Sequence, residues 1–66
     1  MRSKREVAAN ALGASASTLM ILANDIQNGK GPDDIAFGDA TIREAIRLEA
    51  ESIRDRTARL VEEMEA

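Results

Sequence analysis

The chain has no cysteine, histidine, tryptophan or tyrosine, and Phe37 is its only aromatic residue. These absences exclude disulfide bonds and leave no thiolate or imidazole ligand for a structural zinc ion. A chain of 66 residues hides only about 60% of the surface that its unfolded form exposes, so it needs another source of stability. Because disulfides and zinc are excluded, we expect that source to be self-association.

The same absences leave little catalytic chemistry. A nucleophile would have to be a serine or threonine activated by Lys4 or Lys30, and neither lysine is expected to lie in a cleft. The segment Gly29-Lys30-Gly31 lacks the preceding strand and the following Lys-Ser/Thr of a phosphate-binding loop. We therefore predict that the protein is not an enzyme and has no catalytic residue, cofactor or metal ion.

Charged side chains are absent from Val7 to Asn24, although they make up 32% of the whole chain. The uncharged stretch is too polar for a typical membrane span, which needs about 20 predominantly apolar residues. Arg2, Lys4 and Arg5 before it resemble the start of a secretory signal, but the run is opened by a glutamate and diluted by polar residues. We predict a cytoplasmic protein with no membrane contact.

Local signals predict a first helix over residues 3–28. Ser3 and Glu6 have the spacing of a capping box, in which each side chain satisfies a backbone amide at a helix start. Gly29 suits the left-handed position that ends a helix, and Gly31-Pro32 prevents its continuation.

A second helix is predicted over residues 39–65, after a loop over residues 29–38. Asp39 is the first candidate for the N-cap, and Thr41 is the second, because a glutamate follows it at capping-box spacing. Within the loop, Pro32 and the two aspartates after it favour one short helical turn.

The second helix is amphipathic on one side. On a helical wheel its apolar stripe spans about 120° and comprises Ile42, Ile46, Ala50, Ile53, Thr57, Leu60, Val61 and Met64. Glu49 and Arg56 border this stripe, where we expect them to pair with their surroundings.

The first helix is apolar over a wider arc of about 220°, which one neighbouring helix cannot cover. Leu12, Leu19 and Ile26 recur at heptad spacing, and we assign this seam to the second helix of the same chain. A flank of mostly small residues allows a close approach of another backbone, and we assign it to a second copy. This predicted oligomer interface comprises Ala9, Gly13, Ala16 and Met20.

Together these patterns predict an all-α fold with a single helical-hairpin domain over residues 1–66. The hairpin is antiparallel, and two copies form a four-helix bundle. In size and plan the chain resembles the small dimeric helical hairpins that plasmids and bacteriophages use as regulators. That resemblance concerns architecture alone and implies no function by itself.

Two exposed aliphatic residues are candidates for binding another protein. Leu48 has polar neighbours on its helix, Glu44, Arg47 and Glu51, and an apolar centre with a polar rim is typical of interfaces. Ile21 also lies nearly opposite the apolar arc of its own helix. The plainer interpretation is that both are scattered surface residues of an ordinary kind.

A polar line on the first helix is a further candidate. Asn10, Ser17 and Asn24 recur at seven-residue intervals and could hydrogen-bond an uncharged ligand or partner. They could equally face solvent or fix the register of a bundle.

The leading functional hypothesis is a homo-oligomeric interaction protein that binds and modulates another protein, as a regulator, inhibitor or adaptor. The alternative is an RNA- or DNA-binding dimer whose surface combines Arg43, Arg47 and Arg54 with the N-terminal basic cluster. This cluster consists of Arg2, Lys4 and Arg5. Against this alternative stand the net charge of -3 and the lack of aromatic residues for stacking on bases. We expect the basic cluster to pair with Glu62, Glu63 and Glu65 of the same chain. A sponge for a small molecule or nucleotide is the third hypothesis.

Overall fold

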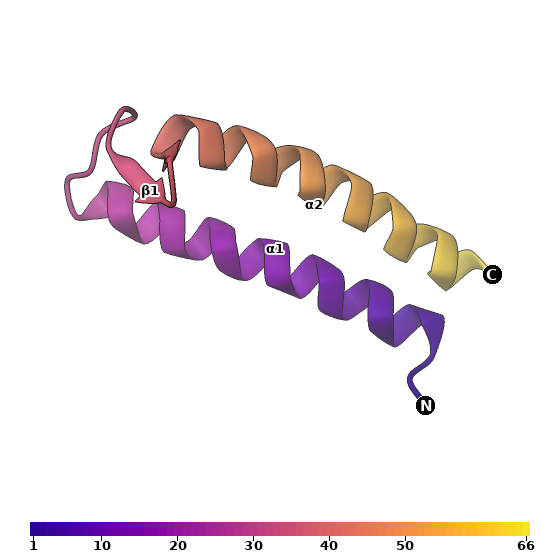
Figure 1. Ribbon diagram of the computed structural model, residues 1–66. Coiled ribbons are helices and arrows are strands. Elements are labelled where there is room, and N and C mark those ends of the chain that lie inside the picture. The colour runs from indigo at the N-terminus through magenta and orange to yellow at the C-terminus, as the bar shows by residue number, and fades with distance from the viewer.

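The computed structural model describes residues 1–66 and shows an antiparallel helical hairpin, about 42 × 19 × 18 Å in extent (Figure 1). The elements in chain order are α1 (Lys4–Gln27), β1 (Ile35–Phe37), β2 (Ala40–Thr41) and α2 (Ile42–Glu65). The two helices lie side by side, and both chain ends lie at the end of the hairpin away from the strands. The predicted helical hairpin is confirmed.

Both helices begin with a capping box. The Ser3 hydroxyl accepts a hydrogen bond from the Glu6 backbone N–H at 3.1 Å. The Thr41 hydroxyl accepts one from the Glu44 N–H at 3.2 Å and donates to the Glu44 carboxylate at 3.0 Å. The N-cap of α2 is therefore Thr41, and the first candidate, Asp39, is wrong because the chain is still turning between strands at that residue.

The connection contains a single hydrogen-bonded turn at Pro32 and Asp33, where the Asp34 N–H donates to the Gly31 carbonyl oxygen at 3.2 Å, and then a small β-hairpin that was not predicted. β1 pairs antiparallel with β2, with Ile35 opposite Thr41 and Phe37 opposite Ala40. Between the strands Gly38 adopts a φ of 57°, the left-handed conformation that such tight turns require at a glycine. A mostly helical description is correct, but the all-α prediction missed this sheet, although β-branched and aromatic residues beside Gly-Asp favour strands.

The apolar core lies at the strand end of the hairpin. Leu22, Ile42 and Ala45 are almost completely buried, and Ala36 of β1 packs against them. Thus β1 does more than join the helices, because it closes one side of the core.

Along the rest of the hairpin, α1 meets α2 through small side chains. Its buried residues are Ala8, Ser15 and Leu22, which follow one another at seven-residue intervals. This line is rotated by about 40° from the predicted seam. Leu12 and Leu19 of that seam flank the contact and are half-buried, whereas 47% of Ile26 is exposed, although it lines a hollow together with Ile42 and Ile46 of α2.

Candidate interaction surfaces

A cation crosses the middle of the contact between the helices. One guanidinium nitrogen of Arg56, Nη1, donates to the Ala11 carbonyl oxygen at 2.7 Å and to the Ser15 hydroxyl at 2.8 Å. Only 1% of Ser15 is exposed, so its hydroxyl depends on a protein partner. The expectation that Arg56 pairs with its surroundings is confirmed, and the centre of the hairpin is polar.

This polar contact displaces the apolar stripe of α2 from α1. The buried and half-buried residues of α2 are Ile42, Ala45, Ile46, Glu49, Ser52, Ile53, Arg56, Leu60 and Glu63. Their mean direction on the helical wheel differs from that of the predicted stripe by roughly 60°. As a result 49% of Val61 and 64% of Met64 are exposed, together with Ala50 and Thr57.

The uncovered part of the stripe continues onto α1. On the helical wheel, the apolar residues of both helices are displaced from the observed contact in the same rotational sense. Because the two helices are antiparallel, this displacement places both apolar lines on the same side of the pair. The structure agrees, because Ile26 of α1 and Ile46 of α2 line one hollow of about 310 Å³. We call this side the apolar face, and it comprises Leu12, Ala16, Leu19, Ala23 and Ile26 with Ile46, Ala50, Ile53, Thr57, Val61 and Met64.

The predicted oligomer interface borders the apolar face and is open in the hairpin. Ala9, Gly13, Ala16 and Met20 are all exposed, and 73% of Met20 is accessible to solvent. A methyl group added at Gly13 would meet no other atom within 4 Å, so nothing in this chain occupies the space beside it. These positions are therefore free to contact something outside the hairpin.

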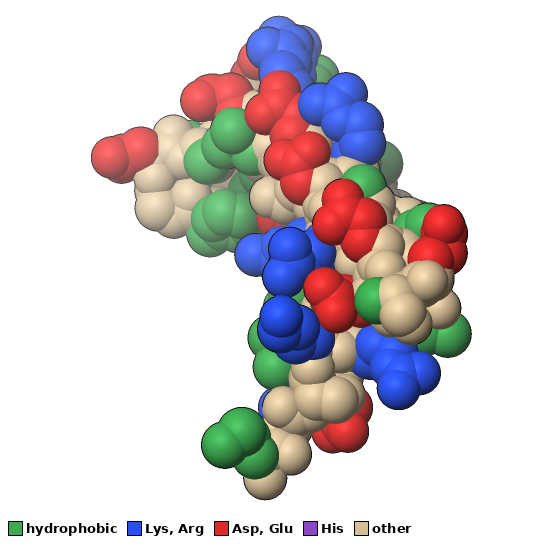
Figure 2. Space-filling view, turned by 90° about the vertical axis from the view of Figure 1, so that its right-hand side faces the viewer, with side chains coloured by type: hydrophobic (Ala, Val, Ile, Leu, Met, Phe, Trp, Pro, Cys, Tyr) green, Lys and Arg blue, Asp and Glu red, His purple; other side chains and the backbone are tan.

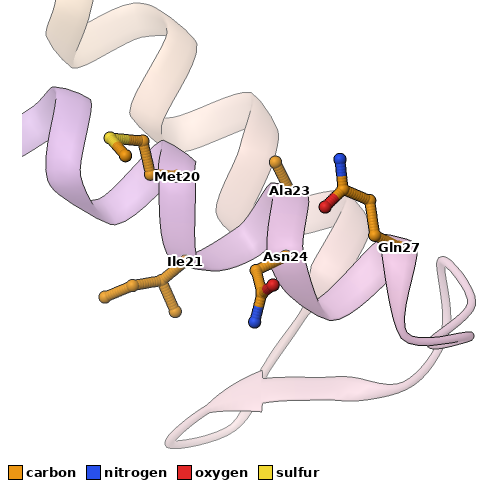
Figure 3. A pocket seen from close by; sticks show the side chains of 5 residues that line it. All are labelled: Met20, Ile21, Ala23, Asn24 and Gln27. Atoms are coloured by element: carbon orange, nitrogen blue, oxygen red, sulfur yellow. The ribbon is translucent and has the colours of Figure 1, made fainter.

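The largest hollow, of about 560 Å³, lies on the outer surface of α1 and contains Ile21 and Asn24. Figure 3 shows that Met20, Ala23 and Gln27 point to one side of the helix and Ile21 and Asn24 to the other. All five lining residues belong to one helix, so no second element closes this hollow.

The predicted polar line lies on the same open surface. Asn10, Ser17 and Asn24 are exposed, and no side chain of the three makes a hydrogen bond within the hairpin. The structure thus brings no other element against them.

Leu48 and Ile21 are 61% and 60% exposed, as their positions in the sequence predict. Glu44 beside Leu48 is held by the Thr41 cap, while Arg47 and Glu51 form no ion pair. The structure therefore leaves the apolar centre and its polar rim accessible.

The predicted pairing of the basic cluster with the C-terminal glutamates is wrong. Arg59 forms ion pairs with two of these glutamates instead, with Glu62 at 4.0 Å and with Glu63 at 3.3 Å. The basic cluster forms no ion pair, because Arg59 is closer to these carboxylates on the same helix. Figure 2, which views the hairpin from this end, shows charged side chains of both signs spread over it.

α1 is also long and apolar enough, by length and composition, to cross a membrane, and only 17% of its most apolar stretch is buried. No group of three or more Asp or Glu side chains is placed to hold a metal ion. No protein-family model, curated protein or solved structure matches this chain.

Proposed function

We propose that two copies of the hairpin pack through the apolar face into a four-helix bundle. This homodimer is a non-enzymatic cytoplasmic protein that binds another protein and modulates its activity. The observation that carries the proposal is the rotation of the α2 stripe away from α1, which leaves Val61 and Met64 exposed at one side of the hairpin.

The energetics support a second copy as the cover of this face. Only five of the 66 residues are buried in the single hairpin, and one of those five is Ser15. Burial of a large aliphatic side chain contributes about 1.5–3 kcal/mol, so covering several such residues adds as much as a small domain possesses in total. A copy of the same face supplies matching apolar surface, as two-fold symmetry requires.

Two alanines of α2 provide a matched test. Ala50 lies on the apolar face, Ala58 lies on the outer surface of the helix, and both are exposed in the single hairpin. We expect Ala50→Glu to disrupt assembly, because it places a charge between the copies, and Ala58→Glu to leave assembly intact. Light scattering should give twice the chain mass of 7.1 kDa for the parent and for Ala58→Glu.

The small-residue border offers a second test of the same interface. Gly13→Leu should weaken or rearrange the dimer by forcing two backbones apart, since a side chain there meets nothing in its own chain. A fully helical parent that melts cooperatively as a monomer would show that the apolar face is not a dimer interface. Cosedimentation of the parent with phospholipid vesicles would identify lipid as the cover and would also overturn the proposal.

Nucleic-acid binding is the second candidate, because Arg2, Lys4 and Arg5 have no carboxylate partner in the hairpin. Arg43 of the same hypothesis is already paired with Asp33 at 3.4 Å. A titration with labelled RNA and DNA at two salt concentrations distinguishes the candidates, because phosphate contacts make affinity fall steeply with salt.

A further inference from the structure

The side of the hairpin opposite the apolar face carries its own group of exposed apolar residues. Ala36 of β1 packs on the core, so its neighbours Ile35 and Phe37 point away from the core and are 53% and 52% exposed. Leu48 follows Ala45, a member of the core cluster against which Ala36 packs, by one helical turn. Figure 3 shows Ile21 pointing toward the side along which the strands run.

We call this side the strand side. It comprises Ile21 of α1, Ile35 and Phe37 of β1, and Leu48 of α2. Four large apolar residues from three elements, each at least half exposed, form more than the scattered single residues of an ordinary surface. The proposed dimer leaves the strand side outward, because the apolar face lies on the other side of the hairpin.

In the first four turns of α2, three carboxylates and three arginines lie on separate lines of the helix. Glu44, Glu51 and Asp55 lie within about 40° of one another on the helical wheel, immediately beside Leu48. None of these three carboxylates has a cation partner. The basic line, Arg43, Arg47 and Arg54, lies about 80° away on the same helix, toward the apolar face.

We propose that the protein bound by this dimer contacts the strand side through a basic amphipathic helix. The apolar side chains of that helix cover Ile21 and Leu48, and its lysines and arginines meet the line of carboxylates that have no cation partner. This proposal rests on the proposed function and specifies the chemistry of the partner.

Two designed peptides test the proposal without knowledge of the natural partner. Both are amphipathic helices of about five turns with one leucine face, and they differ only in carrying lysine or glutamate on the polar face. Each carries fluorescein, and fluorescence anisotropy measures binding to the full chain. The lysine peptide should bind, the glutamate peptide should bind at least about tenfold more weakly, and added salt should weaken the lysine complex.

Variants locate the contact on the strand side. Leu48→Ser should weaken binding of the lysine peptide by about tenfold or more, since an apolar anchor at the centre of an interface dominates its affinity. Glu51→Lys should weaken it clearly. Glu65→Lys makes the same change in net charge at the far end of α2 and should leave the affinity unchanged.

Light scattering on the same samples separates this proposal from the proposed function. A dimeric parent that binds both peptides equally, or binds neither, overturns the inference about the strand side and leaves the dimer standing. Unchanged affinity in Leu48→Ser overturns it as well. A monomeric parent overturns the proposed function itself.

Discussion

Replacement of Arg56 by methionine tests whether the polar contact between the helices stabilises the hairpin. The change keeps much of the aliphatic length but removes the donor to the Ala11 carbonyl and the Ser15 hydroxyl. A hydrogen bond from a charged group contributes about 1.5–3 kcal/mol, and a contact that is partly exposed to solvent falls toward the low end. We therefore expect Arg56→Met to lower the free energy of unfolding by about 2 kcal/mol.

A double-mutant cycle with Ser15→Ala isolates the bond to the hydroxyl. Urea unfolding followed by circular dichroism, at one fixed protein concentration, should give a coupling energy of about 1 kcal/mol between the two substitutions. Arg54→Met is the matched control, because Arg54 is exposed, makes no hydrogen bond or ion pair, and should cost little. A coupling near zero, with Arg56→Met as stable as the control variant, would refute the stabilising role of this contact.

Three further outcomes follow from burial and capping. Leu22→Ala should lower the free energy of unfolding by about 2–5 kcal/mol, and Leu19→Ala by less, since Leu22 is 1% exposed and Leu19 is half-buried; equal losses in urea titrations would contradict the observed core. Thr41→Ala should lower the free energy of unfolding by about 1 kcal/mol in the same assay. A similar loss in Asp39→Ala would contradict the assignment of Thr41 as the N-cap of α2. Leu48→Asp should retain the helical circular-dichroism signal, and a loss of that signal would mean that Leu48 is buried in the assembly.

Sequence patterns predicted the helices well because their signals are local. The capping box at Ser3 and the glycine at position 29 depend only on neighbouring residues, and both lie where the pattern placed them. The strands were missed because β1 is only three residues long, and its packing against Leu22 and Ile42 depends on residues far away in the chain.

The rotation of the helix contact could not be predicted from hydrophobicity. A wheel assigns the most apolar line of each helix to its neighbour, which led to Leu12, Leu19 and Ile26. The contact is centred on Ser15 instead, because the long side chain of Arg56 reaches across and forms a hydrogen bond with its hydroxyl, although Leu19 of the predicted seam also packs against the core. The exposure of Leu48 and Ile21 was predictable, since each lies away from the apolar arc of its own helix, but their common side depended on the position of β1.

The uneven distribution of the core implies an order of folding and a gradient of local stability. The best-buried cluster, Leu22 with Ile42 and Ala45, lies next to the connection, where the loop that must close is shortest. Contacts such as that between Ser15 and Arg56 span 41 residues and can form only after this end has closed. We expect the helices to zip together from the strands outward and to fray from the opposite end. Amide hydrogen exchange should then be slowest around Leu22 and become faster, turn by turn, toward Lys4 and Glu65.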